Sequence, residues 1–291
     1  MFSASDVKTL REKTGAGMLD CKKALDACEG NIDKACDWLR EKGIAKAAKK
    51  SDRIAAEGLS QIFIDGNDAI ILEVNSETDF VAKNDEFKNF VTELGNGLLH
   101  SDVKMMDEAL KLEINGETVE TKVANITAKI GEKISFRRFA KMHKDDDCIF
   151  GDYLHMGGKI AVLVLIKGGN ETVARDVAMH AAAMRPLYIN AEEIPEEVLE
   201  KEKNIMREEL LNEGKPADKI ENILVGKVRK YYEEVCLLNQ IFVKAENKET
   251  VEKYLANNGA TLLHMVRFEV GEGMEKRQDN FAEEVMSQIK G

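Results

Sequence analysis

Hydrophobic residues recur at helical spacing through the first fifty residues, in three short segments that glycines separate. This spacing predicts three helices, from Ser5 to about Lys13, from Met18 to Ala27 and from Ile32 to Lys42, ended by Gly15, Gly30 and Gly43. Ser5 and Asn31 stand where capping side chains are expected. Because helices this short are marginal alone, we expect them to pack as one small bundle. The apolar residues available for its core are Leu10, Met18, Leu25, Ile32, Ala35 and Leu39.

The stretch from Lys42 to Arg53 follows the bundle and is polar, alanine-rich and basic. We interpret it as a helical or flexible linker. A patch that binds phosphate groups is the alternative interpretation. No aromatic residue alternates with the basic residues to stack a base, so the pattern favours the linker.

After the linker the apolar period changes from that of helices to that of strands. The segments Leu59 to Ile64 and Ala69 to Val74 flank an Asp-Gly-Asn turn, which is typical of a β-hairpin followed here by a helix. The same order recurs in a second hairpin from Gly151 to Ile166 and a second helix. Gly58 and Gly151 stand at matching positions of the two hairpins. We therefore expect two structurally similar halves.

Further segments complete these halves. Ile134 to Phe139 is predicted to be another strand. Gln240 to Val243, a helix from Thr250 to Asn257 and a strand from Thr261 to Val270 belong to the second half. Strands joined by hairpins and flanked by helices favour antiparallel sheets, so the predicted fold class is α+β.

A helical hairpin is predicted inside the second half, between residues 193 and 237. Pro195 and the two glutamates after it are typical of the first turn of a helix. Two apolar stripes at helical spacing follow, separated by the break from Asn212 to Pro216. Such a projecting hairpin more often makes contacts than carries out catalysis.

Composition and charge narrow the function classes. The chain has 291 residues, with 53 acidic against 42 basic side chains and a formal net charge of −11. A protein whose main role is to grip nucleic acid needs a basic surface, so this charge argues against that role. The longest apolar stretch, Ile160 to Ile166, is far shorter than the ~20 residues of a membrane span. Five cysteines without a CxxC pair, and no apolar leader at the N-terminus, predict a cytoplasmic protein with reduced thiols.

Motifs of enzyme chemistry are absent from the sequence. It contains no GxxxxGK[ST] phosphate loop, and its five histidines include no HxxxH or HExxH pair. Cys21, Cys28 and Cys36 are spaced for a small helical core rather than for zinc. We interpret His180, in an alanine-rich helix, as a packed residue. The expectation is a protein that is not an enzyme and needs no metal or cofactor.

One segment, Glu73 to Asn84, leaves an apolar strand and enters a helix. Thr78 or Asp79 is a candidate cap for that helix. Phe80 and Val81 are candidates for the apolar staple that seats it on the sheet. From the pattern alone, this structural interpretation is at least as strong as a functional one.

The chain resembles the bacterial translation elongation factor Ts family. The signature-like segments are Leu10 to Leu25 and Thr78-Asp79-Phe80-Val81, joined in the same order by Ala128 to Glu132, Gly214-Lys215-Pro216 and Arg267 to Gly273. The resemblance implies a guanine-nucleotide exchange factor that binds elongation factor Tu in its GDP-bound and nucleotide-free forms. It implies no membrane and no direct nucleic-acid partner.

The resemblance also implies a division of the chain. An N-terminal three-helix bundle similar to ubiquitin-associated (UBA) domains would precede a two-part antiparallel α+β core with an inserted helical hairpin (coiled coil) and a short C-terminal helix. The implied parts are residues 1–53, 54–145, 146–192 with 238–275, the hairpin 193–237 and the module 276–291. In that last module, the helix would run from Asp279 to Ile289.

Specific roles follow from the resemblance, residue by residue. Asp79 and Phe80, flanked by Thr78 and Val81, match the wedge that family members insert between helices of the partner's nucleotide-binding domain, disturbing its magnesium and phosphate site. The other positions that match partner contacts are Met18, Leu19, Ile130, Gly131 and His155. Leu19 stands where methionine is common, a change that conserves volume.

Two alternatives remain open from the sequence. A UBA-type adaptor would bind a peptide through residues 1–53 alone. A nucleic-acid binder would use Lys46, Lys49, Lys50 and Arg53, and its binding would depend steeply on salt. Both alternatives leave the long core without a function.

Overall fold

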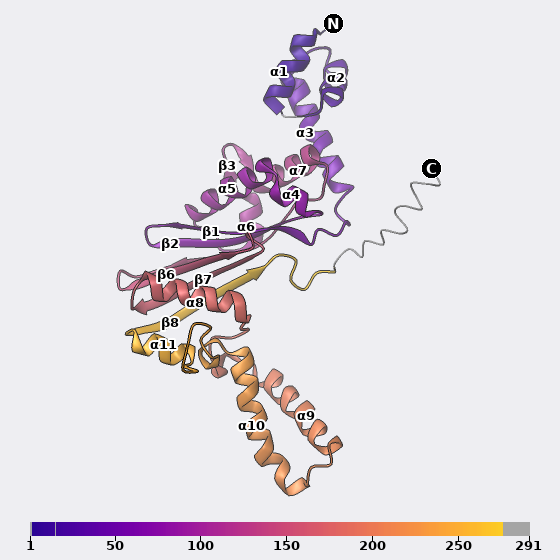
Figure 1. The fold of residues 1–291 in the computed structure, drawn as a ribbon. Coiled ribbons are helices and arrows are strands. Elements are labelled where there is room, and N and C mark those ends of the chain that lie inside the picture. The colour runs from indigo at the N-terminus through magenta and orange to yellow at the C-terminus, as the bar shows by residue number, and fades with distance from the viewer. Residues whose placement is uncertain (1, 15, 276–291) are drawn as a thin grey trace.

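Two three-stranded antiparallel sheets lie face to face at the centre of the structure, a computed structural model that describes residues 2–14 and 16–275 (Figure 1). In each sheet the second strand of a hairpin is central, with orders β1-β2-β5 and β6-β7-β8. The predicted antiparallel α+β fold is therefore confirmed. The strands are β1 (Glu57–Asp65), β2 (Asp68–Ser76), β5 (Ser135–His143), β6 (Cys148–His155), β7 (Ile160–Gly168) and β8 (Ala260–Glu269).

Small and branched side chains fill the space between the two sheets. Ala69 and Ile71 of β2 face Ala161 and Leu163 of β7, with Phe268 of β8 beside them. The period of two along a strand sends the alternate residues of β2 to the opposite face. That face is also buried, because helices cover it, so all of β2 except Asp68 is buried.

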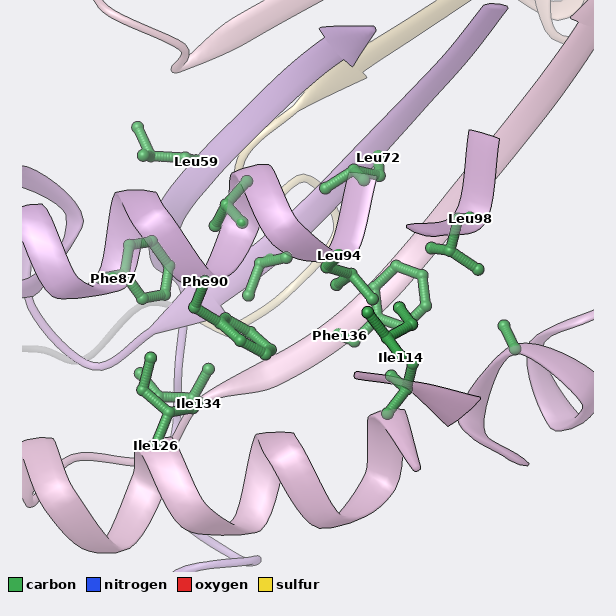
Figure 2. Close-up of a cluster of buried hydrophobic side chains, with 14 of the residues drawn as sticks. Leu59, Leu72, Phe87, Phe90, Leu94, Leu98, Ile114, Ile126, Ile134 and Phe136 are labelled. Atoms are coloured by element: carbon green, nitrogen blue, oxygen red, sulfur yellow. The ribbon is translucent and has the colours of Figure 1, made fainter. Parts of the chain in front are cut away.

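A layer of helices covers the outer face of the first sheet (Figure 2). Phe87, Phe90, Leu94 and Leu98 share one face of the longest helix and point at the strands. The elements of this layer are α4 (Asp79–Lys83), α5 (Asp85–Leu99), α6 (Met106–Lys111), β3 (Glu113–Ile114), β4 (Glu117–Thr118) and α7 (Val119–Ile130). The sequence pattern predicted a single helix here. Asn84 divides it into α4 and α5 by capping α5 with its side chain, and the elements from α6 to α7 were not predicted.

Two helices, α8 (Glu171–Met184) and α11 (Val251–Asn257), cover the outer face of the second sheet. His180 of α8 is fully buried there, which confirms it as a packed residue. Its Nε2 lies 3.0 Å from Oε1 of Gln240, and its Nδ1 accepts a hydrogen bond from the amide of Val243. The segment around Gln240 forms no regular strand, only an isolated bridge between Ile241 and Thr250.

The predicted helical hairpin lies between α8 and α11 and projects away from the sheets (Figure 1). Its helices are α9 (Glu196–Asn212), which begins directly after Pro195, and α10 (Ala217–Val235), with short 3-10 turns η1 (Ala191–Glu193) and η2 (Leu237–Asn239) at its root. Backbone bonds close that root, since the amides of Leu187 and Tyr188 both donate to the carbonyl of Val235.

The N-terminal bundle stands at the other end of the molecule from the hairpin (Figure 1). Its helices are α1 (Ala4–Thr14), α2 (Met18–Ala27) and α3 (Ile32–Ala48), and its buried core is Leu10, Cys21, Ala24, Leu25 and Ala35. Two expectations were wrong. Ser3 rather than Ser5 caps α1, because Ser3 and Asp6 exchange hydrogen bonds. Met18 is 62% exposed, because the core is complete without it. The predicted end at Gly15 and the helix from Asp279 to Ile289 lie outside the described residues.

The predicted end of the third helix at Gly43 was also wrong. A Cβ atom on Gly43 would lie 3.4 Å from the Cβ of Ala128 and 3.8 Å from Oδ1 of Asn125, both on α7. Gly43 therefore lets two helices approach closely instead of ending one of them. The linker is accordingly helical as far as Ala48 and joins the bundle to the core. How the chain divides into independent domains stays a prediction.

A buried carboxylate connects the two sheets. Glu73 of β2 is fully buried and accepts hydrogen bonds from Nη1 of Arg137 (2.9 Å) and Nε of Arg138 (2.6 Å), both on β5. It also accepts from the amide of Gly271, just after β8 (2.9 Å), and from Asn75 (3.0 Å). Burial by itself raises the pKa of Glu73, but these hydrogen bonds and the charge of Arg138 outweigh it and leave the pKa below its usual value. The ionised carboxylate thus ties the first sheet to the end of β8.

We expect Gly151→Ala to destabilise the second half. A Cβ atom at Gly151 would lie 2.3 Å from the carbonyl group of Ala174 in α8. Because that obstacle is backbone, the helix must shift, at a cost of about 1–3 kcal/mol. Urea unfolding measures the loss. The control is Gly226→Ala in α10, where the added Cβ meets open space, and which we expect to stabilise by about 0.5–1 kcal/mol. Equal midpoints for wild type and Gly151→Ala would contradict this packing.

No helix within residues 2–14 and 16–275 is both long and apolar enough to cross a membrane.

Candidate functional site

A short helix, α4, presents the segment that the sequence singled out. Thr78 caps it, since its Oγ1 accepts a hydrogen bond from the amide of Val81 (3.4 Å). Val81 and Ala82 are buried in the cluster beneath the helix. A helix of five residues has little stability of its own, so these contacts hold it in place.

Phe80 points away from this anchor, and 79% of its surface is exposed. Of the two candidates for an apolar staple, Val81 is buried and Phe80 is not, so the burial does not support a staple role for Phe80. A single exposed apolar residue is ordinary on a protein surface. Phe80 differs because its neighbours in α4 are capped and packed. The ring is held out from the surface by a rigid base.

Asp79 and Lys83 flank the ring on the same helix. Nζ of Lys83 lies 2.6 Å from Oδ2 of Asp79 and 5.9 Å from the centroid of the Phe80 ring. The hydrogen bond from Lys83, with the charge of Lys159 adding to it, holds the pKa of Asp79 below its usual value. A carboxylate that is ionised at neutral pH thus stands next to the exposed ring.

Two glutamates join α4 to the loop that follows α7. Glu132 accepts two hydrogen bonds from Thr78, one from its amide (2.9 Å) and one from its hydroxyl (2.8 Å). Glu77 accepts one from the amide of Lys133 (2.6 Å) and one from Nη1 of Arg53 (3.2 Å). The loop after α7, the segment after the bundle and the base of α4 are therefore bound together.

Ile130 and Gly131 lie at the end of α7, directly before that loop. Ile130 is half-buried against the hydrophobic cluster between the first sheet and the helices that cover it, whereas Gly131 is exposed. Gly131 has a φ of 90° and ends α7 in the left-handed conformation, which glycine adopts without strain. Its carbonyl accepts a hydrogen bond from Nζ of Lys50, in the segment after the bundle.

His155 ends β6 at the turn that leads into β7. Its ring is exposed and stacks on Tyr153, with 6.1 Å between the ring centroids. The next residue, Met156, is 72% exposed and has a φ of 50°. That conformation is uncommon for any residue other than glycine. The sequence singled out His155 but not Met156, and no pattern in the sequence marked Met156 as exposed.

The turn after His155 is seated on β1. The amide of Ser60 donates to the carbonyl of Gly158 (2.7 Å), and Lys159 forms an ion pair with Glu57. Lys159 also contributes to the lowered pKa of Asp79. The turn and α4 therefore lie at the same edge of the core.

Met18 and Leu19 lie apart from this edge, on α2 of the bundle. They are 62% and 75% exposed. The structure thus divides the candidate residues into two groups. Thr78, Asp79, Phe80, Val81, Ile130, Gly131 and His155 lie on the core, and Met18 and Leu19 lie on the bundle (Figure 1). The sequence assigned no role to Glu77 or Glu132. Glu77 precedes Thr78 in the chain, but only folding brings Lys133 to Glu77 and Glu132 to Thr78.

Within the described residues, no group of three or more histidine, cysteine, aspartate or glutamate side chains is arranged to hold a metal ion. The arrangement at α4 offers an exposed ring, an adjacent carboxylate and a rigid base. These are means of binding another macromolecule.

Comparison with protein families gives a match over much of the chain. The model of the family described as Elongation factor TS matches residues 77–272, well over half of the chain. The matched range includes α4, α7, both strands around the His155 turn and the helical hairpin, and it begins just before Thr78. The bundle with Met18 and Leu19 lies outside it.

Proposed function

The chain belongs to the elongation factor Ts family, and from this premise we propose that it is a guanine-nucleotide exchange factor for elongation factor Tu, with Phe80 as the wedge that releases GDP. The observation that carries the proposal is the exposure of Phe80, 79%, on a helix that is capped at Thr78 and anchored by Val81.

The physical basis is the sensitivity of a bound nucleotide to small movements. Magnesium and the backbone amides of a phosphate loop hold the phosphates of the nucleotide by electrostatic interactions that weaken when the metal or the amides move. Inserting the Phe80 ring between partner helices would move them. Burial of the ring is favourable by roughly 1.5–3 kcal/mol and offsets part of the cost of that distortion. A ring on a rigid base loses little freedom when it binds, which favours insertion.

Asp79 would act beside the ring. Its carboxylate is ionised at neutral pH, and the hydrogen bond from Lys83 holds its pKa further below the usual value. Next to a phosphate or magnesium site, this charge would add to the disturbance that the ring causes. Exchange of this kind forms no covalent bond, so the chain would not be an enzyme in the usual sense.

The remaining candidate residues would widen the contact. Ile130, Gly131 and His155 lie on the core with α4. Met18 and Leu19 would supply a second contact from the bundle, where two neighbouring apolar side chains face solvent. Contact at two places would hold the partner while the wedge acts.

Exchange requires that the chain and GDP weaken each other's binding to the partner. By linkage the weakening is equal in both directions. The partner without nucleotide would hold the chain strongly, and incoming GTP would then displace it. The proposal therefore predicts that GDP leaves the partner faster when the chain is bound. It also predicts that the chain dissociates more slowly from the nucleotide-free partner than from the GDP-bound partner.

The test is stopped-flow release of fluorescent GDP from purified bacterial elongation factor Tu, with excess unlabelled GDP and increasing amounts of the chain. We expect the release rate to rise with chain concentration toward a maximum. A rate that stays at its spontaneous value at every concentration would refute the proposed function.

A further inference from the structure

Two segments that are distant in the sequence hold each other at the base of α4. Residues 77–78 lead into α4, and residues 132–133 follow α7. The amide of Thr78 donates to Glu132, and the amide of Lys133 donates to Glu77. Each pair thus gives one amide to the other pair's carboxylate. We call this reciprocal arrangement the clasp.

Within the clasp, Glu132 makes two hydrogen bonds to the cap of α4. Its two carboxylate oxygens take both polar hydrogens of the helix cap, from the amide and the hydroxyl of Thr78, at 2.9 and 2.8 Å. Hydrogen bonds to a charged acceptor are the stronger kind. Because the Thr78 hydroxyl also accepts from the amide of Val81, its hydrogen bond to Glu132 helps to orient the cap.

Glu132 itself stands on a fixed backbone. The preceding amide, that of Gly131, donates to the carbonyl of Thr127 (3.0 Å). The amide of Ile134 donates to the hydroxyl of Thr127, which is buried (3.1 Å). The loop that carries Glu132 is therefore fixed to α7, and through Glu132 it fixes the cap of α4 relative to α7.

The clasp also receives the segment that follows the bundle. Nη1 of Arg53 bonds to Glu77, and Nζ of Lys133 bonds to the carbonyls of Ser51 and Arg53. The chain that leaves the bundle is thus bound to two of the four clasp residues, Glu77 and Lys133. The two surfaces that carry candidate contacts, one on the bundle and one on the core, share this attachment.

We propose that Glu132 is a positioning residue for nucleotide exchange, which orients α4 and so the Phe80 ring through the clasp. This inference rests on the proposed function. The buried residues Val81 and Ala82 hold α4 to the core. Without the Glu132 carboxylate, α4 stays attached, but its cap loses both hydrogen bonds to Glu132 and is oriented less firmly. The Phe80 ring then meets the partner in several orientations, and only one of them allows the ring to insert.

The variant Glu132→Gln tests this with little change of shape. We expect the maximal rate of GDP release to fall by about tenfold, the effect of losing one hydrogen bond to a charged group. The concentration of chain at half-maximal rate should change by less than about twofold, because the outer contact surface is unchanged. Thr78→Val removes the hydroxyl that donates to Glu132 and that also caps α4. Because the two changes share the hydroxyl–carboxylate hydrogen bond, the double variant should lose less activity than the two single losses added together.

A second readout uses the free chain without any partner. A 4-fluorophenylalanine at position 80 reports the surroundings of the ring by ¹⁹F NMR. We expect Glu132→Gln to move and broaden this resonance, because the ring samples more orientations. The control is Glu120→Gln, an exposed glutamate at the opposite end of α7, which should leave both the resonance and the release rate unchanged.

The outcomes separate the two proposals. An unchanged ¹⁹F resonance in Glu132→Gln overturns the positioning role, and so does an unchanged maximal release rate beside an active wild type. A wild-type chain that does not accelerate GDP release refutes the proposed function instead. In that case the ¹⁹F comparison still decides whether Glu132 orients Phe80.

Discussion

Phe80→Ala is expected to slow the stimulated release of GDP from elongation factor Tu by roughly 10- to 100-fold, the rate equivalent of burying one phenylalanine ring. The free chain should stay folded, because the ring is 79% exposed and takes no part in the core. Its unfolding midpoint in urea should match that of the wild type. The loss should appear mainly in the maximal release rate, since the ring would act after the partner is bound.

A matched control separates the wedge from a general loss of apolar surface. Met105 is 62% exposed and directly precedes α6. In the chain it follows the end of α5 that is farther from α4. We expect Met105→Ala to leave the release rate unchanged. Equal rates for Phe80→Ala and wild type, or equal losses in the two variants, would contradict the assignment of Phe80 as the wedge.

Glu73→Gln is expected to have the largest effect on stability. The carboxylate is fully buried and faces two guanidinium groups, Arg137 at 2.9 Å and Arg138 at 2.6 Å. Removing its charge leaves both arginines without their buried counter-charge, a change that typically costs about 3–5 kcal/mol. Thermal and urea unfolding measure the loss. A variant within ~1 kcal/mol of the wild type would show that the network contributes little.

The same carboxylate predicts how stability depends on pH. The folded pKa of Glu73 is below its usual value, so its contribution is fully present above the unfolded pKa of about 4.3. It is lost as the pH falls through the lower folded pKa, because the proton then binds the unfolded chain more readily. Stability of the wild type should therefore fall more steeply in acid than that of Glu73→Gln. Parallel pH profiles for the two proteins would contradict a lowered pKa.

Much of the fold followed from local patterns, and the errors have local causes. The two hairpins were predictable because an apolar period of two was interrupted by glycine turns. Gly43 was misread because a glycine inside a helix and a glycine after one look alike in sequence. Only the approach of Ala128, from α7, distinguishes them. Asn84 was likewise a cap within what the pattern showed as a continuous helix.

The site was predictable only in part. The resemblance pointed to Asp79 and Phe80, but the local pattern was equally compatible with a staple that packs on the sheet and with an exposed wedge. Burial decides between them, and burial depends on which side of α4 meets the sheet. Glu132 was present in a recognised segment without a role, since its partner, Thr78, is 54 residues away. Pairings of that range depend on the packing of α7 and are invisible to periodicity.

Glu73 shows the same limit in the core. A glutamate inside the apolar run from Ala69 to Val74 contradicts the pattern of that strand. Of its partners only Asn75 is near in sequence, and the others come from β5 and from Gly271, beyond β8. The segment from Arg267 to Gly273, which resembled a family motif, therefore has a structural role, since it binds Glu73. A Cβ atom on Gly271 would lie 2.2 Å from the carbonyl oxygen of Ala56.

Whether the chain binds its partner at the expense of GDP can be measured at equilibrium. Isothermal titration calorimetry would give the affinity of the chain for elongation factor Tu without nucleotide and with saturating GDP and magnesium. We expect binding to be at least about tenfold weaker in the presence of GDP, because the two ligands are negatively coupled. Equal affinities in the two conditions would contradict nucleotide exchange by this chain.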